Sequence, residues 1–93
     1  MYKKRAKIKV KGLVQGVNFR YDAKKKADSY DLEGYAKNLE TGNEIEIVVE
    51  GIEDNVEKMV RWCKTGSDYS RIEDVEVEYE KPTGEYHEFK IKY

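Results

Sequence analysis

The chain has 93 residues, of which 39% are hydrophobic and 40% are charged, so we expect one small domain over residues 1–93 with a thin core. Its 7 glycines and 1 proline exclude a collagen-like or low-complexity chain, and no apolar run approaches the ~18 residues that cross a membrane. Residues 1–26 carry a net charge of +9 and residues 27–93 one of -10, which favours an anionic ligand near the first quarter.

The first half of the chain predicts two strands around a helix. Ala6, Ile8 and Val10 alternate with lysines, which indicates a half-buried strand. A loop over 12–18 with two glycines leads into a helix over about 19–30, and Asn18 is a candidate N-cap. A second strand follows over about 32–38, and then a hairpin loop over 39–43.

The second half predicts a strand, a helix and two more strands. Ile45, Ile47 and Val49 alternate with Glu44, Glu46, Val48 and Glu50, and Gly51 ends this strand. A helix over about 54–65 stops before Gly66. After a loop over 67–71, a fourth strand alternates over 75–79, a turn covers 81–84 and a closing strand covers 89–93.

This order of elements is typical of one fold. It predicts an α+β, ferredoxin-like β-α-β-β-α-β sandwich: an antiparallel sheet with two helices on one face and a C-terminal tail strand. The first two strands are then parallel, and the third lies between them. Because parallel strands end on the same side of a sheet, the loop over 12–20 and Asn38 should emerge beside each other.

The loop over 12–20 has the composition of an anion site. It joins a strand to a helix start, where unpaired N–H groups carry partial positive charge. Its glycines allow the backbone to wrap a phosphate, and Arg20 adds a planar set of donors. The spacing is neither that of a Walker A loop nor that of a dinucleotide-binding loop. This pattern alone favours neither of two interpretations of the loop, an anion-binding site or a simple turn between strand and helix.

Two stretches resemble the acylphosphatase family. Gly-Leu-Val-Gln-Gly-Val-Asn-Phe-Arg at 12–20 is similar to its first signature, and Gly-Tyr-Ala-Lys-Asn-Leu-Glu-Thr-Gly at 34–42 is similar to its second. Phe89-Lys90-Ile91 also resembles the closing strand of that family. The likeness spans almost the whole chain and is typical of a small free-standing acylphosphatase.

The resemblance implies a reaction and its residues. The reaction is hydrolysis of an acyl phosphate, a small molecule, to a carboxylate and inorganic phosphate, and phosphate also binds as a competitive ligand. Arg20 would hold the phosphoryl group with the backbone N–H groups of the loop, and Asn38 would orient the attacking water. No metal and no cofactor is implied. The expected loop residues are Gln15, Gly16, Val17, Asn18, Phe19 and Arg20.

Several other interpretations are weaker. His87 is expected on the closing strand, remote from both motifs, and Cys63 on the apolar side of the second helix as a small buried hydrophobe. A non-catalytic ferredoxin-like module that binds an anion or a nucleic acid is the main alternative. RNA-binding domains of this fold carry aromatic residues on the third strand, whereas 44–50 is acidic and has none. A catalytically silent regulatory domain is disfavoured by the presence of Arg20 and Asn38.

The same features bear on the compartment and the assembly. A single cysteine excludes an internal disulfide, and the basic start at 3–5 is not followed by the apolar stretch of a secretory signal. We therefore expect a cytoplasmic protein with no membrane or nucleic-acid partner. For so small and charged a chain we also expect a monomer.

Overall fold

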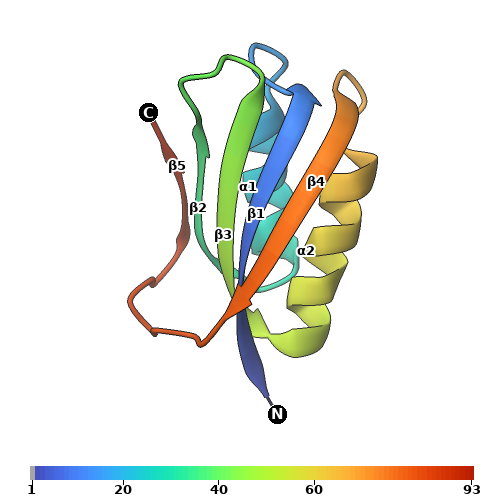
Figure 1. The fold of residues 1–93 in the computed structure, drawn as a ribbon. Coiled ribbons are helices and arrows are strands. Elements are labelled where there is room, and N and C mark those ends of the chain that lie inside the picture. The colour runs from blue at the N-terminus through green and yellow to red at the C-terminus, as the bar shows by residue number, and fades with distance from the viewer. Residues whose placement is uncertain (1) are drawn as a thin grey trace.

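The computed structural model describes residues 2–93 and has one five-stranded sheet with two helices on one face (Figure 1). The strand order is β4-β1-β3-β2-β5. This arrangement confirms the predicted α+β, ferredoxin-like fold. In chain order the elements are β1 Lys3–Leu13, α1 Phe19–Ser29, β2 Glu33–Asn38, β3 Glu44–Ile52, α2 Glu53–Thr65, β4 Arg71–Glu80 and β5 Phe89–Lys92.

Strand β3 pairs antiparallel with both β1 and β2, so these two strands run in the same direction on either side of it. Val10 of β1 and Asn38 of β2 are both in register with Ile45 of β3. The chain therefore leaves β1 and β2 at the same end of the sheet, as the topology predicted.

The predicted C-terminal tail strand makes the sheet mixed, and its direction was not predicted from the sequence. β5 pairs parallel with β2 at the edge opposite β4. The segment 81–88 crosses the end of the sheet at which β4 finishes, and β5 starts from that end (Figure 1). A strand that starts there must run in the direction of β2.

Some predicted boundaries were wrong. β1 continues through Gly12, where a register shift marks an irregularity opposite β4. Gly12 has φ +142°, and a Cβ there would lie 2.0 Å from the carbonyl oxygen of Arg71, so this position requires glycine. β3 also continues through Gly51, which was expected to end it. His87 is exposed and lies just before β5 instead of on it.

The core fills the space between the sheet and the helices. Cys63 is fully buried on the apolar side of α2, as predicted, and burial raises the pKa of its thiol. The thiol is therefore an inert part of the core. The buried apolar residues that the sheet and helices contribute include Ala6, Ile8, Val10, Phe19, Ala23, Ala27, Ala36, Ile45, Ile47, Val49, Val56, Met59, Val60 and Phe89.

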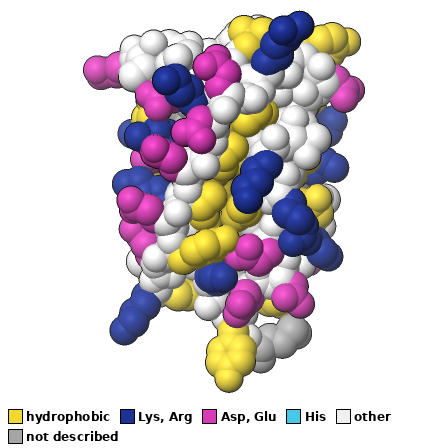
Figure 2. Space-filling view, turned by 45° about the vertical axis from the view of Figure 1, so that its right-hand side comes forward, with side chains coloured by type: hydrophobic (Ala, Val, Ile, Leu, Met, Phe, Trp, Pro, Cys, Tyr) yellow, Lys and Arg dark blue, Asp and Glu magenta, His cyan; other side chains and the backbone are white. Residues whose placement is uncertain are grey.

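Lys7 and Lys9 of β1 lie between two acidic strands on the open face of the sheet. Lys7 is 3.7 Å from a carboxylate oxygen of Glu46 on β3, and Lys9 is 3.5 Å from one of Glu76 on β4. Figure 2 shows that cationic and anionic side chains are interspersed over the surface around β4. The positive charge of these two lysines is thus balanced locally.

A buried carboxylate holds the segment that leads to β5. Glu50 is 5% exposed and accepts hydrogen bonds from Arg5 Nη1 at 2.8 Å, from Thr83 Oγ1 at 2.8 Å and from the N–H of Gly84 at 3.0 Å. Burial alone would raise the pKa of Glu50, but these donors lower it to about 2. The segment after β4 is therefore fixed to the central strand by an ionised side chain.

The substitution Glu50→Gln tests this contact. We expect it to lower the free energy of unfolding at pH 7 by ~2–3 kcal/mol, because a charged, hydrogen-bonded partner is lost. The pKa of Glu50 is lower in the folded chain than its ordinary value of 4.5, so its stabilisation is complete above about pH 4.5 and is lost as the pH falls toward 2.

Urea unfolding of both proteins from pH 7 to pH 2 measures the effect, with the exposed Glu78→Gln as a control. The difference between wild type and Glu50→Gln should narrow below pH 4.5. A difference that stays constant down to pH 2 would contradict the assignment.

Candidate active site

A cavity opens at the end of the sheet where β1 and β2 finish. It contains Arg20 and Asn38 together, although 17 residues separate them in the sequence. Gly16 and Phe19 also line it, whereas Gln15 and Val17 do not. The full set of lining residues is Val14, Gly16, Asn18, Phe19, Arg20, Tyr21, Asn38, Ile91 and Tyr93.

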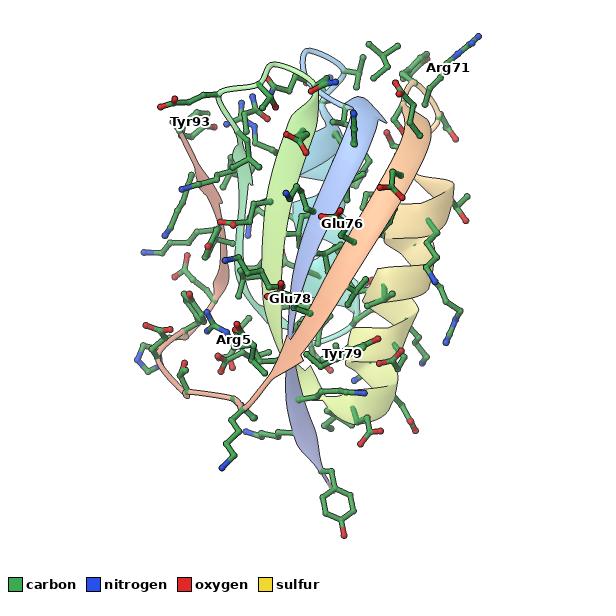
Figure 3. The ribbon with its side chains drawn as sticks, in the orientation of Figure 1. Arg5, Arg71, Glu76, Glu78, Tyr79 and Tyr93 are labelled. Atoms are coloured by element: carbon green, nitrogen blue, oxygen red, sulfur yellow. The ribbon has the colours of Figure 1, made fainter. Side chains whose placement is uncertain are left out.

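Four of these residues were not predicted from the sequence, and the first of them, Val14, lies just before the predicted loop residues. Tyr21 follows Arg20 on α1, and Ile91 and Tyr93 come from the C-terminal segment. Figure 3 shows Tyr93 beyond the end of β5, at the end of the sheet that carries the β2–β3 hairpin. The tail strand was the feature of the sequence that could have indicated Ile91 and Tyr93. A parallel pairing of this strand with β2 places its last residues beside Asn38.

The loop between β1 and α1 turns through two left-handed residues. Gly16 has φ 77° and Asn18 has φ 61°. Asn18 occupies the predicted N-cap position of α1. Its side chain, however, makes no capping hydrogen bond, so the predicted side-chain cap is absent. Asparagine suits the position because it tolerates a left-handed backbone. The loop delivers the N-terminus of α1, with its unpaired N–H groups, to the cavity.

Gln15 joins this loop to the β2–β3 hairpin. Its Nε2 donates to the carbonyl oxygens of Leu39 at 2.9 Å and Glu44 at 3.0 Å. The N–H of Gly12 donates to the carbonyl oxygen of Asn43 at 2.8 Å. Because Leu39 directly follows Asn38, these bonds fix the loop relative to the asparagine.

Arg20 is held by the C-terminal segment. Its Nη1 donates to the carbonyl oxygen of Lys92 at 2.9 Å, and its guanidinium carbon lies 4.8 Å from the centroid of the Tyr93 ring. A guanidinium has five N–H donors, so a single such bond leaves most of them for a ligand. The arginine is thus both positioned and able to bind an anion in the cavity.

Asn38 lines the same cavity and carries an unpaired acceptor. Its Oδ1 is buried, and no donor among residues 2–93 reaches it. Leaving a buried acceptor unpaired costs ~1–3 kcal/mol, so such groups are rare outside functional sites. The cavity therefore brings the Arg20 guanidinium together with an asparagine that has a free hydrogen-bonding acceptor, a pair of groups suited to an anion and a water molecule.

The chain was compared with known proteins. A family model described as Acylphosphatase matches residues 6–91. The chain belongs to the acylphosphatase family. It is 46% identical over 87 residues to an acylphosphatase of Roseiflexus sp. (strain RS-1), covering 94% of this chain and 92% of that one. It is also 42% identical over 89 residues to one of Aeropyrum pernix, covering 96% and 88%.

Solved acylphosphatase structures have the same fold. The crystal structure of acylphosphatase from Bacillus subtilis superposes with a TM-score of 0.91 at 37% identity, covering 97% of this chain and 99% of that one. Membership of this family makes the protein a hydrolase that acts on acid anhydrides.

The described residues 2–93 offer neither a cluster of metal ligands nor a helix that could span a membrane. They contain no group of three or more His, Cys, Asp or Glu side chains arranged to hold a metal ion. Neither α1 nor α2 is long and apolar enough to cross a membrane.

Substitutions of Asn18 test the conformation of the acylphosphatase loop. We expect Asn18→Gly to keep or raise the free energy of unfolding, because glycine adopts positive φ freely. Asn18→Ser should lower it by ~1 kcal/mol, since serine is a good N-cap but is disfavoured in the left-handed region. Thermal and urea unfolding measure both. If the serine variant matched the wild type and the glycine variant lost stability, side-chain capping would be the correct interpretation.

Proposed function

We propose that the protein hydrolyses acyl phosphates with Arg20 and Asn38 as its catalytic residues and without a metal ion. The observation that carries this proposal is that Arg20 and Asn38 line one cavity at the start of α1, and that Asn38 Oδ1 has no donor among residues 2–93. The products are a carboxylate and inorganic phosphate, and inorganic phosphate should also bind competitively.

Arg20 and the backbone of residues 15–20 would bind the phosphoryl group. Backbone N–H groups at a helix N-terminus, together with the helix dipole, stabilise a bound phosphate. The Arg20 guanidinium matches phosphoryl oxygens in geometry and charge. Since its position is already fixed by Lys92, little conformational entropy would be lost on binding. Positioning and charge stabilisation of this kind are the main contributions to phosphoryl transfer.

Asn38 would orient the attacking water. Its Oδ1 can accept a hydrogen bond from a water O–H, which directs a lone pair of that water toward phosphorus. An amide cannot remove a proton at neutral pH, so we assign that role to the phosphoryl group of the substrate. The water oxygen bonds to phosphorus, the bond from phosphorus to the carboxylate oxygen breaks, and the proton of the water passes to a phosphoryl oxygen.

The leaving group explains why few catalytic groups are needed. A carboxylate is a stable anion, so it can depart without a proton from a general acid. Because the substrate supplies its own base, the reaction requires neither a nucleophilic side chain nor a metal-bound hydroxide. The buried Cys63 and the exposed His87 take no part in this scheme.

A nucleic-acid-binding module of the same fold is the alternative, and the open face of the sheet argues against it. Tyr35 on β2 is the aromatic residue best placed for stacking there. Its hydroxyl donates to Glu46 at 2.7 Å, and Lys92 Nζ covers its ring at 3.9 Å. The surrounding carboxylates of β3 and β4 would also repel phosphates.

We also propose that residues 1–93 act as one acylphosphatase domain, a cytoplasmic monomer with no membrane or nucleic-acid partner. A single sheet that holds all the strands from Lys3 to Lys92 supports the first point. The interspersed surface charge supports a monomer, because monomeric proteins expose few large apolar patches. The buried, unpaired Cys63 is typical of a reducing compartment.

Hydrolysis of benzoyl phosphate in excess EDTA tests the catalytic proposal. Wild type should turn over, and chelation should have no effect. Asn38→Ala should lose ~10²–10³-fold in kcat, equivalent to ~3 kcal/mol, because a preorganised hydrogen-bonding group is lost. Arg20→Gln should lose more, since a full charge is removed. Inorganic phosphate should still inhibit Asn38→Ala, to the extent that activity remains, and should bind Arg20→Gln weakly.

Lys26→Met, which removes an exposed cation of α1, is the matched control and should keep near-normal activity. A folded wild type without turnover would contradict the proposed enzyme. Near-normal turnover by Asn38→Ala would contradict the role of this residue in orienting the water.

A further inference from the structure

The edge strand β5 is attached to α1 by two cationic side chains. Arg20 Nη1 donates to the carbonyl oxygen of Lys92, and Lys24 Nζ donates to the carbonyl oxygen of Phe89, each at 2.9 Å. Arg20 and Lys24 are one helical turn apart and so project from the same side of α1. They bind the last and the first residue of β5, respectively.

β5 has few other attachments near the cavity. It is four residues long and pairs with β2 alone, from Gly34–Phe89 to Lys37–Lys92. Its start is fixed by the buried Phe89 ring and by the bond from the N–H of Gly34 to the carbonyl oxygen of Glu88. A short edge strand of this kind frays readily unless it is tied down. In addition to the Phe89 ring, the two cationic side chains supply the side-chain hydrogen bonds that join this strand to α1.

Lys24 is itself held in place for this contact. Its Nζ lies 3.1 Å from Asp28 Oδ2, one further turn along α1. The side chain is partly buried, whereas Lys25 and Lys26 beside it are exposed. These two partners, a carboxylate and a carbonyl oxygen, direct two of the three donors of the lysine.

We propose that Lys24 is a positioning residue for Arg20. By holding β5 against α1, it keeps the carbonyl oxygen of Lys92 where that oxygen fixes the Arg20 guanidinium at the cavity. Arg20 then loses less conformational entropy on binding an anion than a free arginine side chain would lose. This inference rests on the proposed role of Arg20 in binding the phosphoryl group and adds a residue that touches no substrate.

The test compares Lys24→Met, Lys24→Arg and Lys26→Met with wild type. Methionine keeps the apolar stem and removes the donors, while arginine restores a cationic donor. Lys26 lies two residues farther along α1, on the opposite side of the helix, so Lys26→Met loses the same charge without touching β5. This control separates the contact with β5 from a general loss of positive charge.

Two measurements are needed. The first is kcat/KM for benzoyl phosphate together with the inhibition constant of inorganic phosphate. We expect Lys24→Met to lower kcat/KM about 10-fold and to raise the inhibition constant by a similar factor, because the Arg20 guanidinium must then be ordered when the anion binds. Lys24→Arg should recover most of the loss, and Lys26→Met should stay within about twofold of wild type.

The second measurement is the NMR signal of the Arg20 Nε–Hε group in the absence of ligand. In Lys24→Met it should shift and exchange faster with water, because the guanidinium is no longer held, and this readout needs no activity. An unchanged Arg20 signal, or equal kinetic losses in Lys24→Met and Lys26→Met, would overturn the proposal. If wild type proved inactive, the proposed function would fail, while the Arg20 signal and phosphate affinity would still decide the role of Lys24.

Discussion

The pairing of β3 with both β1 and β2 is the constraint on which the site depends. It sets Val10 and Asn38 opposite the same residue, Ile45, and makes the two flanking strands parallel. The loop after β1 and the asparagine at the end of β2 must then meet at one end of the sheet. Gln15 adds the local link, since its side-chain amide bonds the carbonyl oxygens on either side of the hairpin. A site assembled from these two segments needs no long loops, which suits so short a chain.

The C-terminal segment completes the site from the other edge of the sheet. The segment 81–88 crosses the far end of the molecule, where Arg5 and Glu50 hold it, and β5 then returns to the cavity (Figure 3). Its last residues contact Arg20 through the Lys92 carbonyl oxygen and the Tyr93 ring. The Arg20 guanidinium of this family member is therefore positioned by residues at the C-terminal end of the described chain. Contacts remote from the cavity can act on its chemistry through β5.

Much of this was predictable from the sequence because the elements alternate cleanly. The apolar positions at Ile45, Ile47 and Val49 fixed which face of β3 is buried, and the order of elements then placed Asn38 beside the 12–20 loop. That conclusion follows from topology and does not need the family resemblance.

Other features could not be predicted from local patterns. The direction of β5 depends on where the chain crosses the sheet, and four residues carry too little periodicity to indicate it. The left-handed backbone of Asn18 is imposed by the turn, whereas the residue type alone indicates an N-cap. The local balance of charge on β1 could not be predicted either, because net charge per segment ignores neighbours across a sheet, and Lys7 and Lys9 meet Glu46 and Glu76 only in space.

The most direct test of the account is a titration of the wild-type protein with inorganic phosphate, followed by ¹⁵N–¹H NMR. If phosphate binds in the cavity, we expect saturable changes in chemical shift that are largest at the backbone N–H groups of residues 15–20, the Arg20 Nε–Hε group and the Asn38 side-chain amide. Lysines 25 and 26 on the outer side of α1 should move little. Shifts centred on those lysines or on the open face of the sheet, with residues 15–20 unmoved, would contradict it.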